Sequence, residues 1–148
     1  MKNRILFVVI LIVSLLLLTG LTLSNKHQID EPLELHTIMR LIMLDFHTIN
    51  EGIYTQNFDL IASGAASINN HPPLSDESRS LVQDTLGDRM KHFAGFDQLV
   101  HGYADSIKQS AVENDMSGVL EHYQIVQQGC VNCHTAFQEE IREARLSR

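Results

Sequence analysis

Apolar residues recur every three or four positions along most of the chain after residue 30, and this periodicity restricts the fold more than any other feature. It is typical of amphipathic α-helices, each with one face turned toward a core. The clearest stretches run from Asp30 to about Tyr54, from Ser75 to Ile107 and from Asn114 to Ile141. No stretch persuasively shows the alternation of apolar and polar residues expected of a β-strand. The sequence therefore predicts an all-α protein.

Capping signals and a proline pair divide this pattern into four helices. Asp30 is the predicted N-cap of the first helix, and Asn57 that of a second, shorter helix ending near residue 70. His71-Pro72-Pro73 predicts a loop, because a residue that precedes proline disfavours helix. Ser75 starts the third segment, and Asn114 is the predicted cap of the last. Three glycines weaken the third segment and can divide it: Gly87, Gly95 and Gly102.

Four amphipathic segments with short links favour an antiparallel four-helix bundle. Residues 25–148 are enough for one domain with its own core and too few for two. Of the 11 Lys and Arg residues, two lie before residue 25, which leaves nine against 18 acidic residues and a formal charge of −9. This charge makes nucleic acid an unlikely partner and is compatible with a basic or mixed-charge protein partner.

The N-terminus carries an export signal. Met1-Lys2-Asn3-Arg4 is a short basic head, and Ile5 to Leu23 is almost entirely Leu, Ile and Val. By the positive-inside rule this segment directs the rest of the chain across a bacterial inner membrane. Its length reaches the roughly 17 to 25 residues that span a bilayer. Residues 1–24 are therefore predicted to be a signal peptide or an uncleaved membrane anchor, with a periplasmic domain at 25–148.

The only two cysteines form the sequence Cys130-Val131-Asn132-Cys133-His134. This C-x-x-C-H pattern is typical of covalent haem attachment, in which two thiols bond to the vinyl groups of the porphyrin. The spacing lets both sulfurs reach one edge of the macrocycle from a single helical turn, and the histidine then ligates iron. Cys130 and Cys133 are the predicted attachment residues for one haem c, and His134 is the predicted proximal ligand.

Haem-free interpretations of the two cysteines are a dithiol redox pair, a structural disulfide and half of a zinc site. Zinc would need two more ligands from histidines at no recognisable spacing, and a dithiol oxidoreductase would need a βαβ context. The sequence has no nucleophile turn, zinc-protease helix or phosphate-binding glycine loop, so we expect no enzyme. Five other histidines are expected to be ordinary surface or half-buried residues: His27, His71, His92, His101 and His122.

From about Glu31 to Arg142 the chain resembles the class II c-type cytochromes, the cytochromes c′ and their low-spin relatives. The haem motif on the last helix carries this resemblance, together with Phe137, the aromatic residue three positions after the haem histidine. Gln138 stands where cytochromes c′ commonly have a basic residue. The resemblance implies a four-helix bundle that either transfers electrons to redox partner proteins or binds small gases. It also raises the question of a homodimer.

The resemblance places the distal side of the iron on the first helix, where four side chains are candidates: His36, Met39, Met43 and His47. On a helical wheel the apolar face centres near Leu35, Ile42 and Phe46. Met39 lies roughly 50° from that centre and Met43 roughly 90°, while both histidines fall farther away. Met39 is therefore the predicted distal ligand. The alternatives for the distal ligand are Met43, one of the two histidines, or no protein ligand at all. In each of these cases Met39 is an ordinary core methionine.

Three functional hypotheses follow. The first is an electron carrier whose haem has His134 and Met39 as axial ligands. The second is a five-coordinate haem protein that binds nitric oxide or carbon monoxide in an apolar pocket beside Met39. The third is a haem-free periplasmic bundle whose Cys130–Cys133 pair is a redox or metal site.

Overall fold

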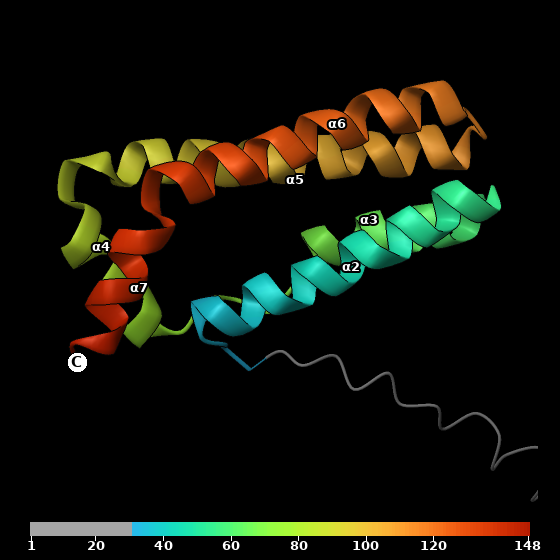
Figure 1. Ribbon diagram of the computed structural model, residues 1–148. Helices are drawn as coiled ribbons and strands as arrows, with labels where there is room; N and C mark the ends of the chain where they lie inside the picture. Colours follow the sequence, from blue (N-terminus) through green and yellow to red (C-terminus); the bar gives the residue numbers. More distant parts are fainter. Residues whose placement is uncertain (1–30) are drawn as a thin grey trace, which may run out of the picture.

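The computed structural model describes residues 31–148, and this part of the chain consists of helices and loops without a β-strand. The body contains α2 (Leu35–Thr55), α3 (Phe58–Asn69), α5 (Met90–Val112) and α6 (Met116–Cys133). Two shorter helices, α4 (Asp76–Leu86) and α7 (Glu139–Leu146), pack against each other at one end (Figure 1). A 3-10 turn, Gly87–Arg89, joins α4 to α5, and a π-helical turn, His134–Gln138, joins α6 to α7. The predicted all-α class is confirmed, and the arrangement is that of a helical bundle.

The body is built from two helical hairpins. α2 packs against α3, α5 packs against α6, and α3 packs against α5 to join the two pairs. Figure 1 shows the pairs converging where α2 ends and α6 begins, and spreading apart toward the end that holds α4 and α7. α2 and α6 run in opposite directions, so the first turns of α2 lie at the same end as the last turns of α6.

Two apolar clusters stabilise the described domain. The larger one fills the converging end with fully buried aliphatic side chains, among them Ile49, Ile61, Ile68, Ile107, Val119 and Val126. The smaller one joins α4 and α7 to the bundle and contains Val82, Leu86, Phe137 and Ile141. Apolar residues of the segment predicted as the last helix enter both clusters, Val119 and Val126 the larger one and Phe137 and Ile141 the smaller one. Cys130 packs against the larger cluster and Cys133 against the smaller one.

The first helix begins later than predicted. α2 starts at Leu35 after Glu34, and the expected cap, Asp30, lies outside the described residues. Residues just before α2 instead contact the loop between α3 and α4. The Leu33 amide donates to the Pro73 carbonyl at 2.9 Å, and the Glu34 carboxylate accepts from the hydroxyls of Ser75 and Ser78. These hydrogen bonds lower the pKa of Glu34. Hydrogen bonds to Pro73, Ser75 and Ser78, which follow much later in the sequence, therefore hold Leu33 and Glu34 outside the first helix.

The remaining boundaries follow the local signals closely. Asn57 caps α3 through its side-chain oxygen, as predicted. Ser75, predicted only to start the third segment, caps α4 in the same way. Gly87 has a positive φ of 51° and divides the third segment. Asn114 was predicted one position too early as the cap of the last helix. It adopts a left-handed conformation with φ of 57°, and Asp115 is the N-cap of α6.

The predicted export segment, residues 1–24, lies outside the described residues. Within residues 31–148, no helix has the length and apolar character needed to cross a membrane.

Gly64 allows α3 to approach α2 closely. A Cβ atom at this position would lie 2.8 Å from the Asp45 carbonyl oxygen and 2.8 Å from the Ile49 side chain. By contrast, a Cβ atom at Gly102, within α5, would meet nothing within 4 Å. Gly64 is therefore required for packing, whereas Gly102 is not.

We predict that Gly64→Ala destabilises the domain by about 1–3 kcal/mol, since the backbone of α2 must shift to admit the methyl group. Gly102→Ala is the matched control and should stabilise the domain by about 0.5–1 kcal/mol, because alanine favours an exposed helix interior. Urea unfolding followed by circular dichroism measures both values. Equal effects of the two substitutions would contradict the close α2–α3 approach.

Candidate functional site

Cys130 and Cys133 lie in the last turn of α6, both half-buried and without a disulfide between them. They are three residues apart on a helix, so both side chains lie on neighbouring parts of one face. His134 follows at once, is exposed, and begins the π-helical turn. π-turns inside helices occur frequently at functional sites. The C-x-x-C-H residues therefore stand together at the spreading end of the bundle.

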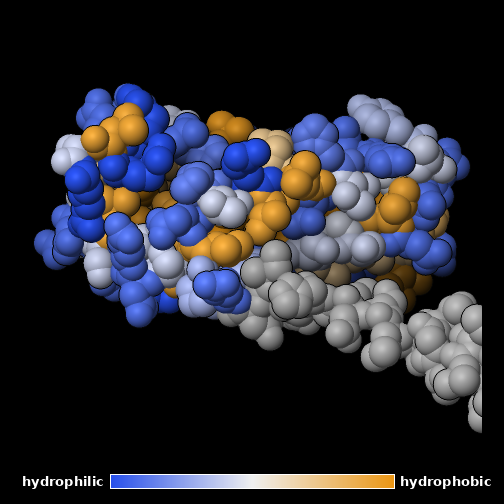
Figure 2. Space-filling model, turned by 90° about the horizontal axis from the view of Figure 1, so that it is seen from below, coloured by the Kyte–Doolittle hydropathy of each residue, from blue (hydrophilic) through white to orange (hydrophobic). Residues whose placement is uncertain are grey.

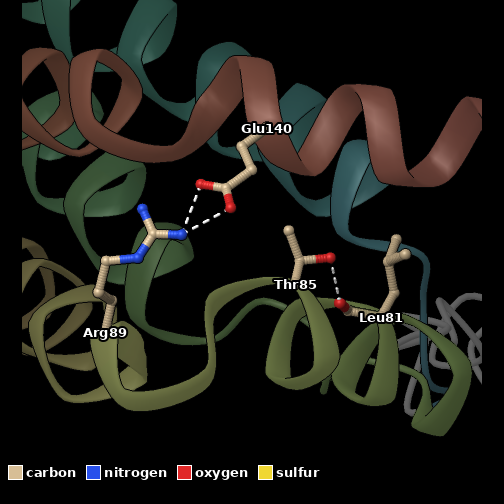
Figure 3. Close-up of polar contacts among 4 residues, drawn as sticks. All are labelled: Leu81, Thr85, Arg89 and Glu140. Atoms are coloured by element: carbon tan, nitrogen blue, oxygen red, sulfur yellow. Dashed lines mark hydrogen bonds and ion pairs between the residues drawn. The ribbon is translucent and has the colours of Figure 1, made fainter.

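The segment after His134 is anchored on the smaller cluster. Phe137 is buried and makes edge-on contacts with Phe93 and Phe96 of α5, with ring centroids 6.0 and 6.2 Å away. The Arg89 guanidinium lies 5.9 Å from the centroid of the Phe137 ring and pairs with Glu140 at 2.6 Å. Figure 3 shows this pair joining the 3-10 turn to α7, beside the Thr85 hydroxyl that donates to the Leu81 carbonyl at 2.7 Å. These contacts fix the chain just beyond the motif.

An aromatic contact sets the register between α2 and α6. The rings of Phe46 and Tyr123 lie with centroids 5.2 Å apart. Met39 precedes Phe46 by seven residues, and Cys130 follows Tyr123 by seven residues. Seven residues are two helical turns, or about 10 Å, and return to nearly the same face of the helix. Because the two helices are antiparallel, Met39 and Cys130 lie at the same level of the bundle.

Met39 and Asp97 are accessible, although each lies two helical turns before a residue packed in or against the larger cluster, Phe46 and Ala104 respectively. Met39 is 39% exposed, and the Asp97 side chain, seven residues before the fully buried Ala104, is 61% exposed. Leu35, one turn before Met39, packs against the same small cluster as Cys133. The N-terminal half of α2 therefore carries accessible side chains at the level of Cys130, beside the small cluster against which Leu35 and Cys133 both pack.

The other candidates for the distal ligand are less favourably placed. Met43 is 57% exposed, compared with 39% for Met39. His36 and His47 are exposed as well, and the His36 ring has only a 3.4 Å contact with the neighbouring Thr37 hydroxyl. Figure 2 looks onto the side of the molecule on which α2 lies and shows hydrophobic groups interrupting a mainly hydrophilic surface. All four candidates are exposed, and Met39 is the less exposed of the two methionines and stands at the level of Cys130.

The surroundings of both thiols disfavour the thiolate form. Burial raises the pKa of Cys130, and burial together with nearby Cys130 and Asp97 raises the pKa of Cys133. Reactive dithiols require a lowered thiol pKa, commonly at a helix N-terminus, whereas these cysteines end a long helix. The site is thus poorly suited to thiol–disulfide exchange.

A group of titratable side chains that sequence reasoning treated as ordinary lies near this region. His71, from the loop after α3, places its Nε2 atom 3.3 Å from Nε2 of His101 on α5. Asp97 lies one turn before His101, with its Oδ1 atom 3.6 Å from the same Nε2. The two histidines are 30 residues apart, so no local spacing indicated their pairing. Within residues 31–148, no three His, Cys, Asp or Glu side chains stand as a complete metal site.

Comparison of the chain with protein-family models, with curated proteins and with solved structures found no significant match.

Asp45 of α2 lies close enough to His71 for their charges to interact. Burial raises the pKa of its carboxyl group from 3.8 to about 6, and His71 opposes this shift only in part. A raised carboxyl pKa means that the folded protein holds the proton more tightly than the unfolded chain. Below about pH 4, Asp45 is largely protonated in both the folded and the unfolded state and does not lower the free energy of unfolding. As the pH rises through about 6, ionisation of this buried carboxyl group lowers the free energy of unfolding.

We predict that Asp45→Asn raises the free energy of unfolding by about 1–2 kcal/mol at pH 8 and leaves it nearly unchanged at pH 4, allowing for solvent screening. The exposed Asp88, replaced by Asn, is the matched control and should show no such pH-dependent gain. Thermal or urea unfolding at several pH values measures the difference. A gain of equal size at both pH values would contradict the shifted titration of Asp45.

Proposed function

We propose that residues 25–148 form a periplasmic c-type haem protein that carries electrons. In this proposal Cys130 and Cys133 bind the haem covalently, His134 is the proximal iron ligand and Met39 is the distal ligand. The observation that carries it is the register across the bundle. The Phe46–Tyr123 contact places Met39 at the level of Cys130, where the two helices spread apart.

The residues at the spreading end fit a covalently held haem. Two half-buried thiols occupy one helix face, an imidazole follows them directly, and a thioether stands on the antiparallel helix. Half-buried apolar side chains of α2 and α5 pack against the two clusters that Cys130 and Cys133 also contact: Leu35, Ile42, Met90, Phe93 and Phe96. A site for a flat, mainly apolar group with a metal at its centre needs this combination. When bound, haem supplies an iron atom that changes between the ferrous and ferric forms.

The chain's own residues then position and tune that group. The Phe46–Tyr123 pair lies toward the large core, two helical turns from Met39 and from Cys130, and the cluster around Phe137 packs against Cys133 at the other end. Anchoring of Phe137 and Glu140 holds the segment that begins with His134, which limits reorganisation of the proximal ligand. Met39 as a sulfur ligand would favour the ferrous form and raise the reduction potential. The acidic surface suits a redox partner with a basic or mixed-charge surface.

A five-coordinate haem protein that binds nitric oxide or carbon monoxide is the second candidate. It is favoured by the 39% exposure of Met39, which leaves the thioether free to turn away from the haem motif. In that case Leu35 and Ile42, both half-buried, would provide an apolar distal surface, and Met39 would act only as a steric gate.

Spectroscopy of the protein produced with an intact haem-attachment system separates the two candidates. We predict a low-spin ferric signal with the methionine–iron charge-transfer band for the parent protein. Met39→Ala should abolish that band and give a high-spin form, because the sulfur ligand is lost. Met43→Ala is the matched control on the same helix and should leave both signals unchanged.

Other outcomes assign the site differently. A high-spin ferric parent whose ferrous form takes up carbon monoxide readily would support the gas-binding candidate. Loss of the charge-transfer band in Met43→Ala, but not in Met39→Ala, would contradict the register argument. A haem-free product would overturn both candidates.

A further inference from the structure

His71 and His101 form the most closely associated pair of metal-ligating side chains in the described part of the chain outside the C-x-x-C-H motif. Their Nε2 atoms are 3.3 Å apart, and the ring centroids are 5.2 Å apart at an interplanar angle of 59°. Both side chains are half-buried, and they come from separate elements, the α3–α4 loop and α5. Their pairing is therefore a product of the tertiary fold.

The spacing of the two nitrogens matches that of two ligands on one tetrahedral metal ion. Zinc–imidazole bonds are about 2.0–2.1 Å long, so two nitrogens on the same ion are separated by roughly 3.3–3.4 Å. The observed separation of 3.3 Å needs little adjustment. Asp97 Oδ1 lies 3.6 Å from His101 Nε2. The three side chains are not already arranged as metal ligands in residues 31–148, so Asp97 would have to turn toward the ion to become the third ligand.

A hydrogen bond within the loop orients the His71 ring. Its Nδ1 atom lies 2.7 Å from the Pro72 carbonyl oxygen, which can only accept a hydrogen bond. Nδ1 therefore carries the proton, and Nε2 presents a lone pair toward His101. A second ring nitrogen that donates to a backbone carbonyl is a common arrangement for histidines that ligate metals. The hydrogen bonds between Leu33 and the backbone at Pro73 and Ser75 hold this loop against the start of α2.

Surrounding charges favour a cation at the pair. Asp45 approaches His71 from α2, and both Asp97 and Asp105 act on His101 from α5. With three carboxylates near two imidazoles, positive charge is stabilised at this position, whether it comes from a proton or from a metal ion.

We propose that His71, His101 and Asp97 form a binding site for one divalent transition-metal ion of the Zn²⁺ type, with water completing the coordination. The ion takes the place of the proton that the two Nε2 atoms share. The proposed ligands are not residues of the C-x-x-C-H motif, although Asp97 lies near Cys133, and the proposal does not depend on the identity of the distal ligand.

Calorimetric titration of the purified, haem-loaded protein with Zn²⁺, after treatment with a chelator, tests the site. We expect one ion per chain, with the affinity lowered at least about tenfold in His71→Ala and in His101→Ala. Asp97→Asn should weaken binding less, because a neutral amide oxygen still reaches the ion. His92→Ala is the matched control, an exposed histidine on the same helix α5, and should bind as the parent does.

Circular dichroism of each variant shows whether the helical fold is retained. Zn²⁺ should also raise the melting temperature of the parent and of His92→Ala, but not that of His101→Ala, since only a folded site binds the ion. Undiminished binding in both His71→Ala and His101→Ala would overturn the proposal. So would the absence of any saturable site in the parent protein.

Discussion

The contact between Phe46 and Tyr123 is the interaction on which the organisation of the site depends. The chain packs α2 on α3, α3 on α5 and α5 on α6, so α2 and α6 face each other without close packing along their length. The aromatic pair, with ring centroids 5.2 Å apart, is where the two helices meet. It fixes their register at one level and allows them to spread beyond it. The proposed pairing of Met39 with the haem motif at Cys130 follows from that register.

The two apolar clusters differ in composition and in the cysteine of the C-x-x-C-H motif that packs against them. Aliphatic side chains at the converging end are fully buried and need no polar partners. At the other end, α4 and α7 cover Phe137, and Arg89 pairs with Glu140 to tie the last helix to the turn before α5. Between these ends lies Asp45, whose pKa burial raises to about 6. This carboxyl group lies close enough to His71 for their charges to interact, and its charged form lowers the stability of the fold.

Much of this fold could be predicted because its signals are local. The spacing of apolar residues gave the helices, and Asn57 and Ser75 acted as the caps that their side chains favour. The predicted start of the first helix at Asp30 was wrong. Glu34, just before the observed start, accepts hydrogen bonds from Ser75 and Ser78, residues more than 40 positions away. For the same reason the His71–His101 pair was missed, since only the tertiary fold brings a loop histidine to α5. The cysteine motif needed no such contact, because its residues are adjacent in sequence. The role of Met39 stays a prediction, since helix periodicity gives its face but does not fix its contacts.

Mass spectrometry of the proteolysed, exported protein tests the central claim most directly. The account predicts that the peptide containing Cys130 and Cys133 carries the added mass of one haem through two thioether bonds, and that replacement of both cysteines by serine removes it. A peptide with two free thiols, or with a disulfide between them, in a strain that attaches haem to its other c-type proteins would contradict the account.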